Sequence, residues 1–172
     1  IDCLVAGEGY ERSDPKEDYD RALAVDRGLV LRFVQTTQAA EWGRLAAHYT
    51  ASAEETFFTQ LAKALKDRGT LDVLRKGIKI VPGIKFSLCY FRPASALEPK
   101  RVAEYRANIL SVMKEVEYST KHGGRLDVVL FVNGLPVATM EAKNLLTGST
   151  FRHAEKQYRK NRSPAGEPLL TF

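Results

Sequence analysis

Residues 126–141 read LDVVLFVNGLPVATME and give the clearest structural signal in the chain. Two runs rich in β-branched and other apolar residues flank Asn133-Gly134. An Asn-Gly pair between such runs is the strongest short-range signal for a hairpin, because both residues tolerate a positive φ. The stretch therefore predicts two antiparallel strands joined by a tight turn.

Two acidic residues lie in this otherwise apolar hairpin. Asp127 opens the first predicted strand, and Glu141 closes the second, with Lys143 two residues further along. A carboxylate in an apolar strand has to be paired or bind a metal ion. Residues two apart in a strand share a face, so Glu141 and Lys143 point the same way if the strand continues. The backbone carbonyl of Ala142, which lies between them, is a candidate third metal ligand.

This set of groups suits the hydrolysis of a phosphodiester bond. Carboxylate oxygens hold Mg²⁺, which polarises the phosphate and lowers the pKa of bound water. A lysine ammonium can orient the attacking water or stabilise the pentavalent transition state. The spacing also fits a structural alternative, in which Asp127 caps a strand end and Glu141 forms a solvated surface pair with Lys143.

The register of the hairpin separates these two interpretations. In a plain two-residue turn across Asn133-Gly134, Asp127 faces Met140. Asp127 and Glu141 then lie on opposite faces of the sheet and cannot share a metal ion. A one-residue bulge reverses this parity. A metal site therefore requires an irregular hairpin.

We predict that irregularity as a three-residue loop, Val132-Asn133-Gly134, with Gly134 in the left-handed conformation. This loop pairs Phe131 with Leu135 and turns both acids onto one face. Pro136 favours a disturbed ladder nearby, because it donates no backbone hydrogen bond. A regular two-residue turn without a compensating irregularity would contradict the metal site.

Periodicity and turn residues predict the elements around the hairpin. Ser52-Ala53-Glu54-Glu55 has capping-box spacing, so a helix is expected from Ser52 to a stop at Gly69. Residues 1–20 are expected to form a polar lead-in. The other expected helices cover residues 27–48, 70–76, 99–113 and 149–162, and the other expected strands cover residues 78–81, 86–91, 115–119 and 169–172.

The chain of 172 residues has the size of one domain and the composition of an ordinary soluble protein, with 44% apolar and 27% charged residues. No apolar run is long enough to span a bilayer, and the first residues do not resemble a signal peptide. Cys3 and Cys89 are expected to be reduced thiols. Because the chain starts without Met and its last residues resemble a strand in progress, we expect it to be part of a longer protein.

Charge is unevenly spread along the chain. The net charge is +5, yet residues 1–26 carry −5, from eight acidic and three basic residues. The remainder therefore carries +10, which is compatible with a polyanionic partner.

A basic stripe lies in the helix expected over residues 149–162. Its members recur every fourth residue or lie beside those that do, namely Arg152, Lys156, Arg159, Lys160 and Arg162. Such a stripe can neutralise DNA phosphates, or it can be a solvated helix face. Tyr158 lies on the apolar side of the same helix and can equally belong to the core.

Four segments carry a family resemblance. They are the hairpin with its continuation Met140-Glu141-Ala142-Lys143-Asn144, and the segments Leu71–Arg75, Tyr90–Pro93 and Gln157–Lys160. Together they resemble the nuclease domain in the N-terminal region of the restriction (R) subunit of Type I restriction-modification enzymes. That domain belongs to the PD-(D/E)xK superfamily. Leu126 stands where the superfamily name expects Pro, a site at which proline does no chemistry.

The resemblance implies an α/β domain of the α+β type, with a restriction-endonuclease-like mixed β-sheet flanked by helices and a helical N-terminal portion. It implies a single nuclease domain over residues 1–172. Residues 1–76 would form a mostly helical lead-in, and residues 77–172 would form the nuclease core with a truncated last strand.

The implied activity is that of a type I site-specific deoxyribonuclease, a Mg²⁺-dependent endonuclease acting on double-stranded DNA. Asp127, Glu141 and Lys143 match the first acid, the second acid and the lysine of the motif. The family also has a Gln-x-x-x-Tyr motif on the following helix, for which the chain offers the adjacent Gln157 and Tyr158. These two join Arg152, Lys156, Arg159 and Lys160 as expected DNA contacts.

In the family, this domain leads a large subunit whose later domains form an ATP-driven DNA translocase, and which associates with modification and specificity subunits. The chain has no G-x-x-x-x-G-K-[ST] loop, so ATP is expected to bind the full-length subunit outside these residues. The implied location is the cytoplasm of a bacterium or archaeon, without membrane contact. The alternative function is a catalytically silent nuclease-like module that binds DNA or a partner subunit.

Overall fold

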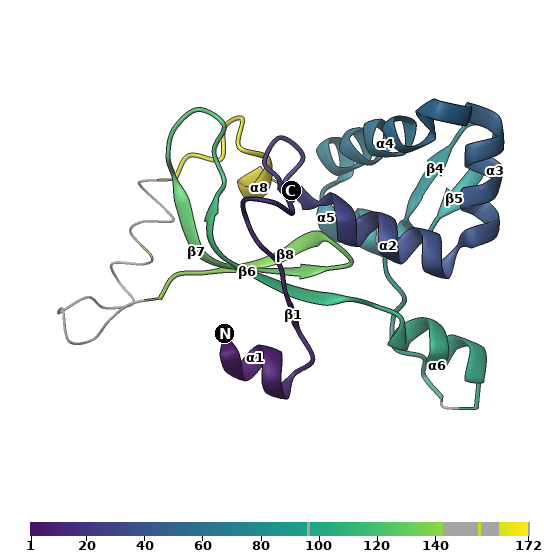
Figure 1. Ribbon diagram of the computed structural model, residues 1–172, viewed down its shortest axis with the longest axis horizontal. Helices are drawn as coiled ribbons and strands as arrows, with labels where there is room; N and C mark the ends of the chain where they lie inside the picture. Colours follow the sequence, from purple (N-terminus) through teal and green to yellow (C-terminus); the bar gives the residue numbers. More distant parts are fainter. Residues whose placement is uncertain (96, 143–154, 156–161, 172) are drawn as a thin grey trace.

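A four-stranded mixed sheet runs through the middle of the molecule, with strand order β1-β6-β7-β8 (Figure 1). The computed structural model describes residues 1–95, 97–142, 155 and 162–171. The strands are β1 (Glu11–Arg12), β6 (Leu110–Glu117), β7 (Arg125–Val132) and β8 (Leu135–Met140). β1 pairs with β6 in parallel, and the other two pairings are antiparallel. This mixed α+β architecture confirms the predicted fold class.

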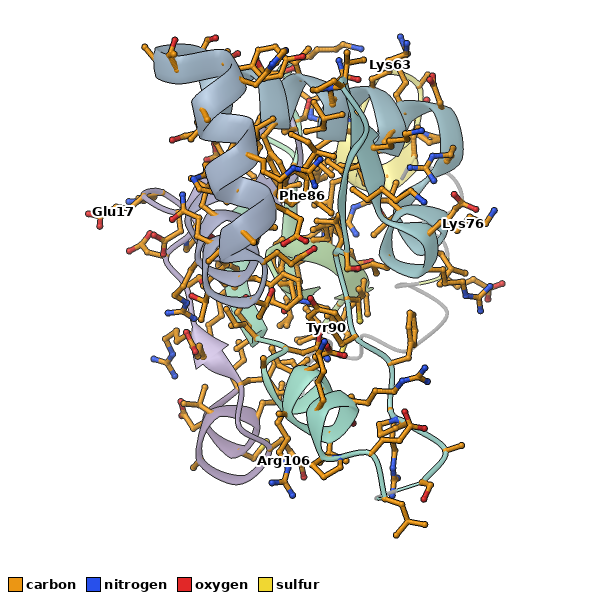
Figure 2. The ribbon with its side chains drawn as sticks, turned by 90° about the vertical axis from the view of Figure 1, so that its right-hand side faces the viewer. Glu17, Lys63, Lys76, Phe86, Tyr90 and Arg106 are labelled. Carbon is orange, nitrogen blue, oxygen red and sulfur yellow. The ribbon has the colours of Figure 1, made fainter. Side chains whose placement is uncertain are left out.

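A helical unit packs at one end of the sheet (Figure 1). It consists of α2 (Arg27–Thr37), α3 (Ala39–Tyr49), the 3₁₀ turn η1 (Thr50–Ser52), α4 (Ala53–Arg68), α5 (Thr70–Lys76) and the hairpin of β4 (Ile78–Ile80) and β5 (Ile84–Phe86). Figure 2 shows Phe86 inside this unit, with Lys63 and Lys76 at its surface. The Trp42 ring lies 5.7 Å from that of Phe57 and 6.3 Å from that of Phe86, so Trp42 has the packing role expected of it.

The apolar residues form two cores. The larger one fills the helical unit and includes Leu135 from the start of β8. The smaller one lies on the sheet, where Met113, Val129 and Phe131 pack with Leu169 of α8 (Pro168–Thr171). Because β8 contributes to the larger core while its partner β7 contributes to the smaller one, the β7–β8 hairpin connects the two parts of the molecule.

The helix expected over residues 99–113 ends early, as α6 (Pro99–Arg106). The Asn108 amide nitrogen donates to the carbonyls of Tyr105 at 2.8 Å and Tyr90 at 2.6 Å, and its oxygen accepts from the Tyr90 N–H at 3.0 Å. From Leu110 onward the backbone pairs with β7. The hydrogen bonds of Asn108 and of the β6–β7 ladder therefore take the place of further helical hydrogen bonds. The strand expected over residues 115–119 begins earlier, as β6.

Four further expectations need correction. The strand expected over residues 86–91 lies earlier, as β5. The helix expected over residues 27–48 breaks at Gln38, whose side chain exchanges two hydrogen bonds with the backbone of Ser87. Ser52 precedes α4 as predicted but does not cap it, because its hydroxyl donates to the carbonyl of Tyr49 at 2.9 Å. In place of the expected closing strand, the chain forms the helix α8, which begins at Pro168. Proline suits the first turn of a helix.

The N-terminal segment is more ordered than a polar lead-in. It contains α1 (Asp2–Gly7) and β1, and a short ladder of β2 (Tyr19–Asp20) with β3 (Val25–Asp26). Cys3 and Cys89 are both free thiols, as predicted. Within the described part of the chain, no helix is long and apolar enough to cross a membrane.

Candidate active site

The turn of the β7–β8 hairpin has two residues. Asn133 and Gly134 adopt φ values of 51° and 80°, the pattern of a type I′ turn. Val132 pairs with Leu135, and Phe131 pairs with Pro136. The predicted three-residue loop, which paired Phe131 with Leu135, is therefore wrong, because Asn133 and Gly134 together satisfy the tight turn.

The predicted irregularity is nevertheless present, three residues further along β8. Leu130 pairs with Ala138, so Val137 has no residue opposite it and forms a bulge. The bulge directly follows Pro136, the residue that cannot donate to the ladder. The predicted bulge is thus confirmed, and its position is corrected from the turn to Val137.

The bulge brings the two acids together. Beyond it the register pairs Val128 with Met140, the last pair of the ladder. Continued by one residue, this register would set Asp127 opposite Glu141, on one face of the sheet. Asp127 Oδ2 accepts a 2.7 Å hydrogen bond from the backbone N–H of Ala142. The Asp127 carboxylate therefore holds the chain where it leaves β8, next to Glu141.

The side chain of Glu141 has little exposure and pairs with an arginine far along the sequence. Its Oε1 lies 2.5 Å from Nη2 of Arg162, and the two side chains are 3% and 9% exposed. The same Arg162 nitrogen donates to the carbonyl of Arg125 at 2.8 Å. The sequence groups Arg162 with the basic stripe and does not indicate this contact, because nothing in the spacing distinguishes Arg162 from its basic neighbours.

The other end of the hairpin is fixed against the helical unit. The buried Asn133 amide donates to the carbonyl of Leu88 at 2.9 Å and accepts from the N–H of Ile109 at 2.7 Å. The carbonyl of Gly134 accepts from the N–H of Asp26 at 2.9 Å. A Cβ atom on Gly134 would lie 2.4 Å from the Asp26 carbonyl oxygen, so only glycine fits there.

The oxygen donors at the open end are of the chemical kind that binds a magnesium ion. Mg²⁺ is usually bound by one or two carboxylates together with water, and Asp127 with Glu141 supplies two carboxylates on one face. In the described ranges, no group of three or more His, Cys, Asp or Glu side chains could hold a metal ion. A site here would therefore rest on these two acids, a backbone carbonyl such as that of Ala142, and water.

The remaining predicted site residues fall outside the described part of the chain. These are Lys143, Arg152, Lys156, Gln157, Tyr158, Arg159 and Lys160. His48 and His122 take part in ring contacts with Tyr49 and Tyr118, and His122 Nε2 also lies 3.7 Å from Glu167 Oε1.

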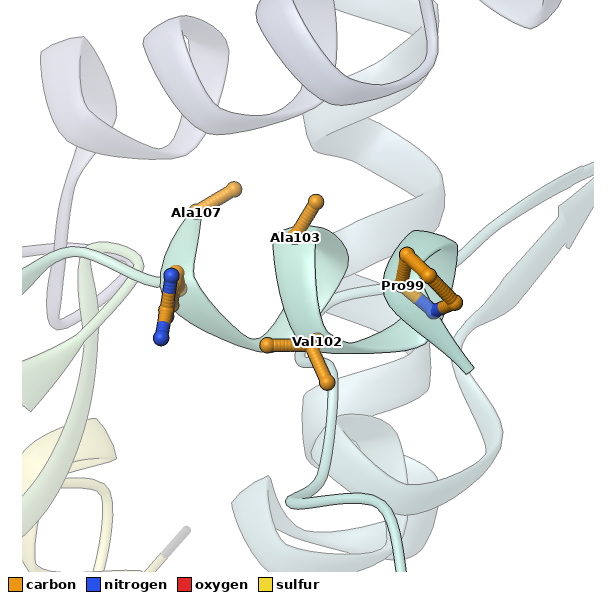
Figure 3. Close-up of a pocket in the computed structure, with 5 residues that line it drawn as sticks. Pro99, Val102, Ala103 and Ala107 are labelled. Atoms are coloured by element: carbon orange, nitrogen blue, oxygen red, sulfur yellow. The ribbon is translucent and has the colours of Figure 1, made fainter. Parts of the chain in front are cut away.

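One hollow of the surface, shown in Figure 3, lies on α6. It has a volume of about 610 Å³ and is lined by Pro99, Val102, Ala103, Arg106 and Ala107. None of these is a predicted site residue, and the hollow offers no carboxylate. We therefore place the candidate site at the open end of the β7–β8 hairpin.

Comparison with known families identifies the domain as a whole. The chain matches the family described as the N terminus of the Type I restriction enzyme R protein over residues 9–172. No curated protein and no solved structure matches the chain. The family match spans almost the whole chain and includes both Asp127 and Glu141. The chain therefore belongs to the family of Type I restriction enzyme R protein N-terminal domains.

Proposed function

We propose that this domain is the Mg²⁺-dependent endonuclease of a Type I restriction enzyme R subunit and hydrolyses phosphodiester bonds of double-stranded DNA. The bulge at Val137 is the observation that carries the proposal, since the register beyond it, continued by one residue, would set Asp127 and Glu141 on one face of the sheet. Membership of a restriction-enzyme family supports it.

Each catalytic residue has one role in this proposal. Asp127 and Glu141 hold the metal ion, and the backbone carbonyl of Ala142 completes the protein ligands. When bound, Mg²⁺ polarises the scissile phosphate and lowers the pKa of the attacking water. Lys143 contributes a positive charge that orients this water and stabilises the negative charge of the transition state.

The basic residues after the hairpin supply the DNA contacts. Gln157 and Tyr158, with the bases Arg152, Lys156, Arg159 and Lys160, would lie along the phosphate backbone and make affinity fall steeply with salt. Sequence recognition and methylation belong to specificity and modification subunits in this proposal, and ATP is used by other domains of the R subunit.

DNA cleavage by the assembled restriction enzyme tests the proposal. Glu141→Ala and Lys143→Ala are each expected to reduce cleavage by at least about 100-fold while ATP hydrolysis is retained. Asp127→Asn is expected to abolish cleavage too, yet to change folding stability by less than about 1 kcal/mol, because the amide oxygen still accepts from Ala142.

Glu17→Ala is the matched control, since Glu17 is an exposed acid outside the β7–β8 hairpin. Cleavage that survives both Glu141→Ala and Lys143→Ala would refute the proposal.

The ion pair between Glu141 and Arg162 favours a second candidate, a nuclease-like module that binds DNA or a partner subunit without cutting. An arginine can serve as the permanent counter-ion of an acid that never binds metal. In that case, Glu141→Ala would leave cleavage by the assembled enzyme unchanged, and DNA binding measured by fluorescence anisotropy would also persist.

A further inference from the structure

Two exposed aromatic residues, each followed by an arginine, lie on α6 and on the segment that precedes it. The pairs are Phe91-Arg92 and Tyr105-Arg106, and we call these four residues the α6 surface. Phe91 is 58% exposed and Tyr105 is 42% exposed, and both arginines are exposed as well. Uncovered apolar side chains that gather in one place, with polar groups around them, are a feature of interaction sites.

The two pairs are joined through Asn108. Its amide nitrogen donates to the carbonyl of Tyr90 at 2.6 Å and to that of Tyr105 at 2.8 Å. Tyr90 directly precedes Phe91, and the centre of its ring lies 5.5 Å from that of Phe33 in the larger core. The α6 surface therefore stands on a part of the chain that is fixed to the rest of the fold.

A hollow of about 460 Å³ lies between the two segments. Its lining consists of Arg92, Pro93, Ala94, Val102, Tyr105 and Arg106. It contains two guanidinium groups and one aromatic ring, and none of its residues is acidic. It shares Val102 and Arg106 with the hollow of Figure 3, so the two hollows adjoin.

The arginines of the α6 surface are not neutralised by nearby acids. Glu98 and Glu104 are the acids of this region, and each pairs with another base of α6, at nitrogen–oxygen distances of 2.8 and 4.0 Å. Arg92 and Arg106 form no ion pair with any residue that the structure describes. The surface therefore carries two uncompensated positive charges and is complementary to an anionic partner.

Aromatic rings next to arginines suit an unpaired strand of nucleic acid. The faces of its bases stack on phenylalanine and tyrosine rings, and guanidinium groups bind the phosphates between the bases. In a duplex the bases are stacked on one another, so the rings would gain nothing from it. An acidic peptide would neutralise the arginines without giving the rings a flat partner.

We propose that the α6 surface binds a single-stranded segment of DNA, with bases stacked on Phe91 and Tyr105 and phosphates bound by Arg92 and Arg106. This site is separate from the candidate active site.

The α6 surface and the acids lie toward opposite ends of the sheet. α6 leads into β6 at Leu110, which pairs with Val132 beside the turn of the β7–β8 hairpin. Asp127 and Glu141 lie at the other end of this hairpin (Figure 1). Binding at α6 therefore does not rest on the metal site, and the two proposals can be tested apart.

Photo-cross-linking of the full-length R subunit, in EDTA and without nucleotide, tests binding at the residues concerned. The probe is a thymidine oligomer of about 12 nucleotides that carries 5-iodouracil, which couples to aromatic side chains that stack on it. Mass spectrometry identifies the coupled residue, so DNA bound elsewhere on the subunit does not contribute. We expect coupling at Phe91 or Tyr105. No coupling at either residue would overturn the proposal and leave the proposed function standing, since EDTA removes the metal ion.

Replacing the arginines tests the phosphate contacts. Arg92→Gln combined with Arg106→Gln is expected to lower the coupling yield at limiting oligomer about tenfold, and to reduce the logarithmic salt slope by about 1.4, or about 0.7 for each phosphate contact. Arg44→Gln, at an exposed arginine on α3, is the matched control and should couple like the wild type. An unchanged yield in the double variant would overturn the phosphate contacts.

Replacing one ring tests stacking through the other. Tyr105→Ala is expected to lower the coupling yield at Phe91 about tenfold, because a stacked base is lost while both charges remain. Leu71→Ala removes a side chain of similar exposure, 59%, on α5 and should leave the yield unchanged. Equal yields in these two variants would contradict stacking on Tyr105.

Two further probes distinguish the other occupants. The same oligomer annealed to its complement is expected to couple at least about tenfold less, because its bases are paired and stacked within the duplex. A poly-glutamate peptide of the same charge is expected not to displace the oligomer. Equal coupling by the duplex, or displacement by the peptide at the concentration of the oligomer, would overturn the proposal and assign the surface to duplex DNA or to an acidic peptide.

Discussion

The two ends of the β7–β8 hairpin are held by different chemistry. At the turn, backbone groups and the neutral amide of Asn133 make the contacts, and a glycine without a side chain fits against α2. At the open end, the contacts come from the charged side chains of Asp127, Glu141 and Arg162. Neutral contacts fix the position of the hairpin, while charged contacts can be exchanged for others. The turn thus sets the geometry of the hairpin, and the open end carries the charged groups that the proposed function uses.

Deletion of Val137 is expected to have the largest effect on function. It removes the bulge and restores the plain register, in which Asp127 and Glu141 lie on opposite faces. Cleavage by the assembled enzyme should fall to background while the turn remains intact. Val137→Ala keeps the residue count, and because Val137 is 45% exposed it should cleave nearly as well as the wild type. Full activity after the deletion would show that the register does not bring the acids together.

Gly134→Val should have the largest effect on stability. The new side chain would meet the Asp26 carbonyl and the Val30 backbone at a residue with φ of 80°, where L side chains are strained. We expect a loss of at least about 3 kcal/mol of unfolding free energy in urea titrations. Gly123→Ala is the comparison, because a Cβ there meets nothing within 4 Å and should change stability by less than about 0.5 kcal/mol. Equal values for the two variants would contradict a fixed turn.

The smallest expected effect is on the pH dependence of the free energy of unfolding, through Asp26 beside the turn. Burial raises the pKa of Asp26, although its hydrogen bond from the N–H of Leu29 opposes the shift. The Asp26 carboxylate therefore binds a proton more readily in the native protein than in the unfolded chain, where the pKa of this group is near 3.8. Protonated Asp26 therefore adds to the free energy of unfolding below pH 3.8. This contribution is lost as the pH rises through the pKa of Asp26 in the native protein.

Asp26→Asn keeps an acceptor suited to a helix N-cap and removes the charge. As pH falls from 7 toward 3.8, the wild type should gain unfolding free energy relative to Asp26→Asn, measured in parallel denaturant titrations. A difference between the two proteins that stays constant with pH would be inconsistent with a raised pKa.

The sequence predicts those parts of the fold that depend on local rules. Asn133-Gly134 identifies the hairpin because the turn needs two residues with positive φ. The helix over residues 70–76 is also recovered. Local periodicity gives the wrong prediction for residues 107–113, because the spacing of Ile109 and Val112 fits a helix. In the structure, hydrogen bonds of Asn108 and Asn133 end the helix, and β6 begins at Leu110.

The candidate site is predictable only in part, because it combines a local and a distant feature. Asp127 and Glu141 stand out as acids in apolar strands, and the metal chemistry requires a bulge somewhere between them. The place of that bulge depends on how Pro136 packs in the finished sheet, which the residue pattern does not contain. β1 and the contact of Arg162 with Glu141 were missed for the same reason, since each depends on a partner far along the chain.

The single unpaired residue at Val137 has a consequence for how the hairpin can change in length. Inserting one residue into each strand beside the turn lengthens the hairpin but preserves the facing of Asp127 and Glu141, whereas inserting one residue into a single strand reverses it. Natural relatives should therefore tolerate even changes in the spacing between the two acids and lack odd ones, unless a second bulge compensates. The distance between these residues along the chain thus carries a parity constraint that does not depend on which side chains fill it.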